Sequence, residues 1–242
     1  MKGTPAPVSV TLRELRGTKG VVSAHPNYIA RTTQSTAPSD SAIGGPSGPV
    51  ATLKPNDPLF SAQWMHEKLD SLEAWQLSQG AGTVVAVIDT GVDWAHEDLA
   101  QNIWKNTDEV AGDGIDNDGN GYIDDVIGWD FVDTYPFTSI PLEDFENEDN
   151  NPTDYFGHGT HVAGIVAARM GNQKGIVGVC PRCAVMSLRA GYAPGYLEYA
   201  DTADAIVYAA DNGARVINMS FGGSYDEPSQ QAALDYAYGK GV

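Results

Sequence analysis

Two short segments of the sequence carry residues that could move a proton. In the first, His158 lies between Gly157 and Gly159, just before a run of small apolar residues at 162–170. The glycines leave room for another group to approach the imidazole, and the apolar run predicts a helix with His158 at its start. The partial positive charge of a helix N-terminus favours the neutral ring that a general base needs.

Asp89 is the second candidate, because it directly follows a short apolar, β-branched run at 84–88 that predicts a buried parallel strand. Functional groups gather at the carboxyl ends of such strands, where Asp89 could orient a base without reacting itself. An Asp that caps a turn is the alternative. Asp-Thr-Gly also marks aspartic proteases, but those are all-β proteins with two such carboxylates, and only one occurs here.

His158 and His161 could instead share a metal ion. Their i,i+3 spacing differs from the i,i+4 spacing of the zinc motif His-Glu-x-x-His, and no Glu lies between them. The spacing therefore argues against a metal pair. A buried structural histidine remains the other alternative.

Residues 108–154 are strongly acidic, with 15 Asp or Glu and no Lys or Arg. Crowded carboxylates repel one another unless a cation lies among them. Oxygen-bearing side chains alternate here as in an EF-hand loop, although Ile127 stands where that loop has a bidentate Glu. A Ca²⁺ site is therefore predicted, against the alternative of a solvated acidic loop. Its expected ligands are Asp113, Asp116, Asp118, Asn120, Tyr122, Asp124 and Asp125.

The composition limits the partners of the chain. With 32 acidic and 14 basic residues the formal net charge is −18, so nucleic acid is excluded, because phosphate binding needs clustered Lys and Arg. No apolar run approaches the roughly 20 residues that a membrane helix needs. No apolar stretch follows Met1 as in a secretory signal peptide.

The two cysteines, Cys180 and Cys183, form a C-x-x-C motif. Two ligands cannot complete a four-coordinate zinc site, and a redox motif would need a thioredoxin-like context that is missing here. The pair is either a local disulfide or two unreactive thiols. The sequence leaves both open.

Composition divides the chain into three regions. Residues 1–31 carry five bases and one acid, and residues 32–58 are rich in Ser, Thr, Pro and Gly, as in a flexible linker. From 59 to 242 strand patterns alternate with helical patterns, which predicts an α/β fold with a parallel sheet between helices. The strand patterns lie at 84–88, 184–188 and 215–219, and the helical patterns at 162–170, 200–211 (ended by Gly213) and 229–238.

Four segments, in this order, resemble the subtilisin family of serine proteases (subtilases). They are residues 87–93 (Val-Ile-Asp-Thr-Gly-Val-Asp), 96–99 (His-Glu-Asp-Leu), 158–164 (His-Gly-Thr-His-Val-Ala-Gly) and 216–223 (Val-Ile-Asn-Met-Ser-Phe-Gly-Gly). The resemblance implies a three-layer fold with a parallel sheet flanked by helices, and serine endopeptidase activity with the chain order Asp, His, Ser. It implies that Asp89 orients His158 and that His158 takes the proton of a serine hydroxyl.

The resemblance also implies binding sites that the residues alone do not establish. Ser220, Phe221 and Gly222 match the strand whose backbone pairs with an extended polypeptide substrate; without the resemblance they are an ordinary strand end. A second Ca²⁺ site is implied, with a surface loop as the alternative. Its side-chain ligands would be Asp98 and Asn172, and its backbone carbonyls would come from Arg169, Lys174 and Ile176.

Residues 1–31 resemble the C-terminal part of a subtilase propeptide, which assists folding and inhibits the enzyme until it is removed. Processing is then expected within 32–58. The family implies an extracellular, monomeric protease with its own propeptide as a partner.

In subtilases the nucleophile lies in a Gly-Thr-Ser-Met-Ala segment, and an Asn after a further strand helps form the oxyanion hole. No Gly-Thr-Ser occurs among the 242 residues. We therefore expect a chain truncated before the catalytic Ser, with a fold incomplete at its C-terminus and no activity on its own. A non-catalytic, calcium-binding degenerate protease or binding module is the alternative.

Overall fold

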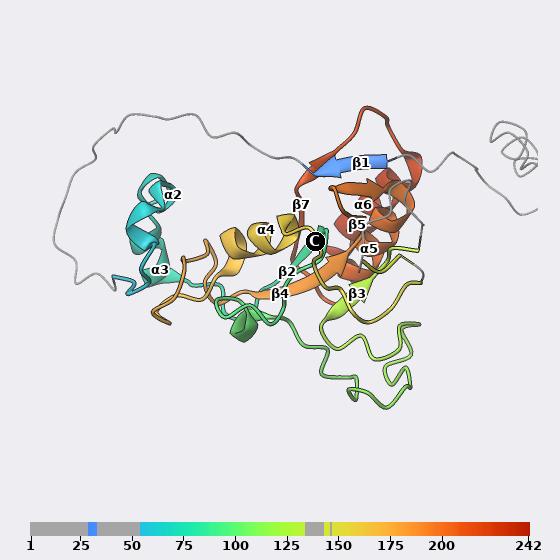
Figure 1. Cartoon of the computed structure of the whole chain (residues 1–242), viewed down its shortest axis with the longest axis horizontal. Helices are drawn as coiled ribbons and strands as arrows, with labels where there is room; N and C mark the ends of the chain where they lie inside the picture. Colours follow the sequence, from blue (N-terminus) through green and yellow to red (C-terminus); the bar gives the residue numbers. More distant parts are fainter. Residues whose placement is uncertain (1–28, 33–53, 134–142, 146) are drawn as a thin grey trace, which may run out of the picture.

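The computed structural model describes residues 29–32, 54–133, 143–145 and 147–242 (Figure 1). Its strands are β1 (Ile29–Thr32), β2 (Val84–Asp89), β3 (Gly128–Asp130), β4 (Ala184–Arg189), β5 (Gly191–Tyr192), β6 (Tyr196–Glu198), β7 (Val216–Met219) and β8 (Phe221–Gly222). Its helices are α2 (Trp64–Lys68), α3 (Ser71–Leu77), α4 (His158–Ala167), α5 (Tyr199–Asp211) and α6 (Pro228–Lys240), with short 3₁₀ turns at Phe60–Ala62 and Ala100–Asn102. No helix in these ranges is long and apolar enough to cross a bilayer.

A parallel sheet in the order β3-β4-β2-β7 forms the centre of the fold. β2 pairs with β4 from Val84↔Ala184 to Asp89↔Arg189, and with β7 on its other side. Both faces of β2 and β4 are covered, which explains their nearly continuous apolar sequences. The three strands predicted from the sequence are confirmed.

Helices cover both faces of this sheet (Figure 1). Val85 and Val87 pack with α4, whereas Ala86 and Ile88 face α5 and α6. Successive side chains of a strand point to opposite faces, so one apolar strand serves two separate cores. The expected three-layer α/β architecture is confirmed, as is the glycine at the end of α5, where Gly213 has φ +81°.

A second sheet has the order β5-β6-β1-β8. Its strand β1 pairs antiparallel with β6 (Ile29↔Glu198) on one edge and with β8 (Arg31↔Gly222) on the other. In Figure 1 this strand, drawn in blue, lies beside segments from the red, C-terminal part of the chain. Residues 29–32 thus form an extended middle strand that joins β6 to β8.

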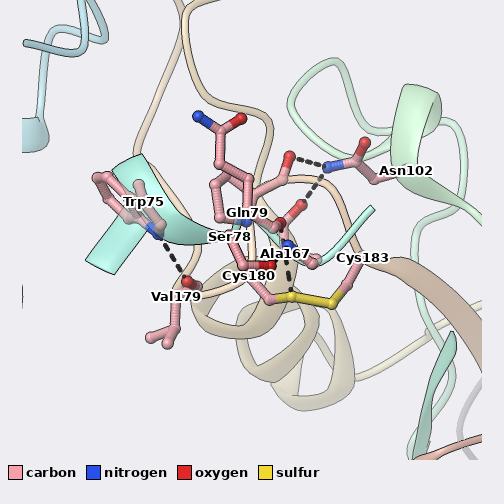
Figure 2. The surroundings of a disulfide bond; sticks show 10 residues. Trp75, Ser78, Gln79, Asn102, Ala167, Val179, Cys180 and Cys183 are labelled. Atoms are coloured by element: carbon pink, nitrogen blue, oxygen red, sulfur yellow. Dashed lines mark hydrogen bonds between the residues drawn. A yellow bond between two sulfur atoms is a disulfide. The ribbon is translucent and has the colours of Figure 1, made fainter. Parts of the chain in front are cut away.

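Cys180 and Cys183 form a disulfide, which decides between the two alternatives for the C-x-x-C motif. The bridged turn leads into β4, and the connection between α3 and β2 docks on it (Figure 2). Trp75 Nε1 donates to the carbonyl oxygen of Val179 at 2.9 Å, and the Arg182 N–H donates to that of Gln79 at 3.0 Å. The disulfide therefore lies where the N-terminal helices meet the central sheet.

Candidate active site

Asp89 ends β2 and His158 begins α4, and the packing of this helix on the sheet brings the two side chains together. His158 Nδ1 lies 2.8 Å from Asp89 Oδ1. Asp89 is fully buried and His158 is 9% exposed. The structure thus brings together the two residues that the sequence singled out for proton transfer.

The Asp89 carboxyl lies in a dry environment. Burial raises its pKa, while the hydrogen bonds from His158 and from the backbone N–H of Thr90 act in the opposite direction. Within the described part of the chain, Asp89 Oδ2 has no hydrogen-bond partner. Because water does not screen this carboxylate, its attraction for a positive charge on the adjacent imidazole is strong.

Gly159 allows the start of α4 to lie against the end of β2. A Cβ atom at this position would be 2.0 Å from the carbonyl oxygen of Gly91 and 3.0 Å from Asp89 Cβ. Any larger residue would force the helix away from the strand. The glycine after His158 is therefore needed for the Asp89–His158 contact.

Asp154 ties the loop after β2 to the first turn of α4, and sequence reasoning missed it. Its Oδ1 accepts the hydroxyl of Thr90 at 2.9 Å and the N–H of Gly157 at 2.7 Å. Its Oδ2 accepts both the N–H and the hydroxyl of Thr160, and Thr90 in turn accepts the N–H of Gly159. An Asp shortly before a helix is a known capping signal, but here the surrounding acidic stretch concealed it.

The residues expected to bind substrate lie beside an extended segment. Phe221 and Gly222 form β8 and pair with Thr32 and Arg31 of β1. Ser220 accepts a hydrogen bond from Asn218 Nδ2 at 2.9 Å. The backbone edge of β8 is therefore engaged in antiparallel pairing.

The acidic loop gathers three carboxylates into one cluster. Glu109, Asp118 and Asp125 each offer an oxygen within 4.8 Å of the others. Asn106 Nδ2 donates to both aspartates, and Asn120 Nδ2 donates to the same pair. Three of these five residues, Asn120 and the two aspartates, were predicted as ligands; Glu109 and Asn106, which lie before the alternating motif, were missed.

The other predicted ligands of this loop make different contacts. Asp116 accepts backbone N–H groups of Gly119, Asn120 and Gly121, and the bond from Gly121 is the main cause that lowers its pKa. Asp124 accepts three further backbone N–H groups and Asp113 accepts that of Ile115, while the Tyr122 ring packs against Trp129 and Tyr208. These carboxylates shape the loop from its own backbone, which differs from an EF-hand.

Asp98 and Asn172, the predicted side chains of the second site, are in contact. Asn172 Nδ2 donates to Asp98 Oδ1 at 2.7 Å, and the N–H of Ile176 donates to Asp98 Oδ2 at 2.9 Å. The N–H of Arg169 donates to the Asp98 carbonyl, and Lys174 forms an ion pair with Glu97. Buried Asp57, which the sequence assigned to the linker, accepts the N–H groups of Gly171 and Asn172 and joins this group.

Comparisons with known proteins show which family the chain resembles. Residues 80–242 match the Peptidase_S8 model of the subtilase family. The chain is 35% identical over 188 residues to thermitase of Thermoactinomyces vulgaris, covering 77% of this chain and 54% of thermitase. It is 36% identical over 212 residues to an extracellular protease of Xanthomonas campestris pv. campestris, covering 79% of this chain and 34% of that protein.

A solved structure, described as proteases from Pseudoalteromonas arctica PAMC 21717, superposes with a TM-score of 0.62 at 30% identity. The match covers 78% of this chain and 57% of that one. The chain spans about half the length of thermitase and a smaller part of the Xanthomonas protein. The subtilase family model matches the part of the chain from β2 to α6, which contains the central sheet, Asp89 and His158. The chain therefore belongs to the subtilase family.

Proposed function

We propose that the protein is a serine endopeptidase in which Asp89 and His158 form the acid and base of an Asp-His-Ser charge-relay system. The observation that carries this proposal is the 2.8 Å contact between His158 Nδ1 and Asp89 Oδ1, both buried at the carboxyl end of the central sheet. Membership of the subtilase family supports it.

His158 acts through the imidazole nitrogen that does not face Asp89. It takes the proton of a serine hydroxyl as the serine oxygen attacks the peptide carbonyl, and it later gives that proton to the leaving amine. Asp89 holds the Nδ1–H tautomer and stabilises the imidazolium without taking the proton. The low exposure of Asp89 strengthens this interaction.

The 242 residues contain no Gly-Thr-Ser segment to provide the nucleophile. Ser220 matches the substrate strand and is no substitute. We therefore expect these residues to hydrolyse peptides only when a nucleophilic serine is supplied in addition. A calcium-binding protein without catalysis remains the second candidate, and the cluster of Glu109, Asp118 and Asp125 favours it.

The proposed substrates are extended polypeptides that pair with Ser220, Phe221 and Gly222 through their backbone. The antiparallel pairing of β1 with both β6 and β8 supports this, because these edges already pair with one extended strand. We assign residues 1–31 to the end of an inhibitory propeptide, 32–58 to a linker with the processing site and 59–242 to the peptidase domain. Residues 1–31 would then inhibit the peptidase by occupying the place of the substrate.

Ca²⁺ is the proposed cofactor. The donors of the acidic cluster are carboxylate and amide oxygens, which suit a hard cation, and three carboxylates this close repel one another without one. Glu109, Asp118 and Asp125 would hold the ion, with Asn106 and Asn120 beside them. Asp98 and Asn172, with carbonyls of Arg169, Lys174 and Ile176, would hold a second. Both ions would stabilise loops and take no part in the chemistry.

We propose that the protein acts outside the cell, as a monomer. The disulfide supports an oxidising compartment, and the Xanthomonas relative is described as extracellular.

The test joins residues 1–242 to the serine-bearing C-terminal half of a catalytically competent subtilase. We expect hydrolysis of casein that a serine-directed phosphonate abolishes, and none from the 242 residues alone. His158→Ala should remove the activity, whereas His161→Ala in the same helix should not. Phosphonate-sensitive hydrolysis that survives His158→Ala would overturn the proposal.

A further inference from the structure

Arg189 is a fully buried cation at the carboxyl end of β4. In the parallel sheet it stands in register with Asp89 of β2 and Asp130 of β3. Its guanidinium binds two other carboxylates instead of that of Asp89. Nη1 forms an ion pair with Asp130, and Nη2 donates to Glu143 Oε1 at 3.1 Å. A charge so deeply buried is kept only where several groups hold it.

Glu143 connects this cation to the hairpin formed by β5 and β6. Its carboxylate accepts the N–H of Ala193, the residue after β5, at 3.0 Å. The next residues reinforce the link, because the carbonyl of Asp144 accepts from Arg189 Nη2 at 2.8 Å and the Phe145 ring packs edge-on against Tyr192. The segment 143–145 thus fastens the hairpin to the end of β4.

The same cation also faces the loop that leads to His158. The ring of Tyr155 lies over the guanidinium, with 5.2 Å between Arg189 Cζ and the ring centroid. Tyr155 directly follows Asp154, whose carboxylate holds the first turn of α4. Arg189 therefore touches both the support of the hairpin and the loop before the candidate base.

We propose that Arg189 and Glu143 are positioning residues that hold the β5–β6 hairpin, and so the strand edge that pairs with an extended peptide, at a fixed place relative to the Asp89–His158 pair. The catalytic part of this proposal rests on the proposed function, because β6 matters to catalysis only if substrate pairs with it. The structural part, that Glu143 keeps β6 and the paired strand β1 in place, does not depend on the proposed function.

Hydrogen–deuterium exchange of the whole 242-residue chain tests this without any need for activity. In Glu143→Ala the amides of β6 and β1 should exchange at least about 10-fold faster, while those of β2 and β4 stay within about threefold of wild type. Glu143→Gln keeps one oxygen for the Ala193 N–H and should restore most of the protection. Glu148→Gln is the matched control, since Glu148 accepts from Trp129 Nε1 at 3.3 Å on the same acidic stretch.

Three results would overturn the proposal: equal acceleration in all strands, no acceleration in β6, or the same pattern in Glu148→Gln. Should Glu143→Ala yield no folded protein, Glu143→Asp takes its place, because its carboxylate is one methylene shorter and holds the Ala193 N–H less well. The ratio of exchange in β6 to that in β2 must then be higher in Glu143→Asp than in Glu148→Gln. In the fused enzyme, Glu143→Ala should raise KM for an extended peptide about 10-fold and change kcat less than about threefold. If the fused enzyme is inactive but Glu143→Ala still accelerates exchange selectively in β6 and β1, the proposed function fails and the structural role of Glu143 stands.

Discussion

His158 Nδ1 and Asp89 Oδ1 meet at 2.8 Å although 69 positions separate the two residues in the chain. A proton held between an imidazole and a buried carboxylate is strongly deshielded, so the Nδ1–H of His158 should give a ¹H NMR signal far downfield of the amide region. Asp89→Asn should remove this signal, because a neutral acceptor polarises the N–H less. Asp93→Asn, at an exposed position of the same segment, should leave it unchanged.

In the fused enzyme the Asp89→Asn variant should lose activity by roughly 10⁴-fold, as other serine proteases do when the triad aspartate is altered. A signal that persists in Asp89→Asn would mean that another group holds the His158 proton.

Two glycines of α4 give a matched test of how the pair is held. In Gly159→Ala the new Cβ would meet Gly91 O at 2.0 Å, whereas in Gly164→Ala it would meet only Ile176 Cδ1, at 3.6 Å. We expect Gly159→Ala to abolish the downfield signal and to destabilise the fold by about 1–3 kcal/mol. Gly164→Ala should keep the signal and change stability by at most about 1 kcal/mol, in the stabilising direction, because alanine favours helix. Equal effects in urea unfolding would contradict this account.

Buried Asp201 should make the chain less stable as the pH rises, because its carboxyl has a raised pKa. Burial raises the pKa of Asp201 to about 8. Between the ordinary value near 4 and this value the folded state binds more protons at Asp201 than the unfolded state, so the contribution of Asp201 to stability decreases as the pH rises across this window. Asp201 Oδ2 has no partner among the described residues to offset its charge.

Asp201→Asn imitates the protonated acid and should remove part of this decrease. At pH 9 the variant should exceed wild type by about 1–3 kcal/mol in free energy of unfolding, with a difference below about 1 kcal/mol at pH 5. Exposed Asp226→Asn is the control and should follow wild type at both pH values. Urea titrations at the two pH values measure the free energy of unfolding. An equal difference between the variant and wild type at both pH values would contradict the assignment of the pH dependence to Asp201.

Much of the fold follows from local sequence. β2 and β4 are apolar throughout because helices cover both of their faces, and the carboxyl ends of adjacent parallel strands bring functional groups together. The short strands β5 and β6 were missed, since two or three residues give no periodicity and β6 is paired with β1, which lies far away in the sequence. The same holds for the site. Asp89 and His158 could be predicted from the segments around them. Asp154, Arg189 and Glu143 could not, because their contacts form only in the packed structure.

The cation cluster illustrates this limit and provides a further prediction. An alternating pattern indicated Asp118 and Asp125 but equally Asp113, which lies outside the cluster, and it gave no sign of Glu109. If Ca²⁺ binds at the cluster, EGTA should lower the melting temperature, because an ion present at about 100 times its Kd stabilises by about 2.7 kcal/mol. Glu109→Gln and Asp118→Asn should shrink this EGTA-sensitive difference, and Asp113→Asn should preserve it. Calorimetric scans with and without EGTA would contradict the assignment if Asp113→Asn alone were affected.

The disulfide supports the turn on which the α3–β2 connection docks, and Gly80 and Gly82 form a matched pair to test it. Both have positive φ, +79° and +82°, but a Cβ at Gly80 would lie 2.0 Å from Cys180 Sγ and 2.6 Å from Cys183 Sγ, whereas a Cβ at Gly82 meets nothing within 4 Å. Gly82→Ala should therefore lose only the roughly 1–2 kcal/mol of left-handed strain. Gly80→Ala should lose about 1–2 kcal/mol more, since the bonded sulfurs cannot move apart.

Reduction provides the decisive comparison for this pair. Breaking the bridge of wild type should destabilise the chain by about 2 kcal/mol, the loop-entropy value for so short a loop. Once reduced, Cys180 and Cys183 can separate and relieve the contact with the new methyl group. The excess destabilisation of Gly80→Ala over Gly82→Ala should therefore narrow in the presence of a phosphine reductant. Urea unfolding of both variants, oxidised and reduced, measures it; an excess that reduction leaves unchanged would mean that Gly80 is required by the backbone alone and not by the sulfurs packed against it.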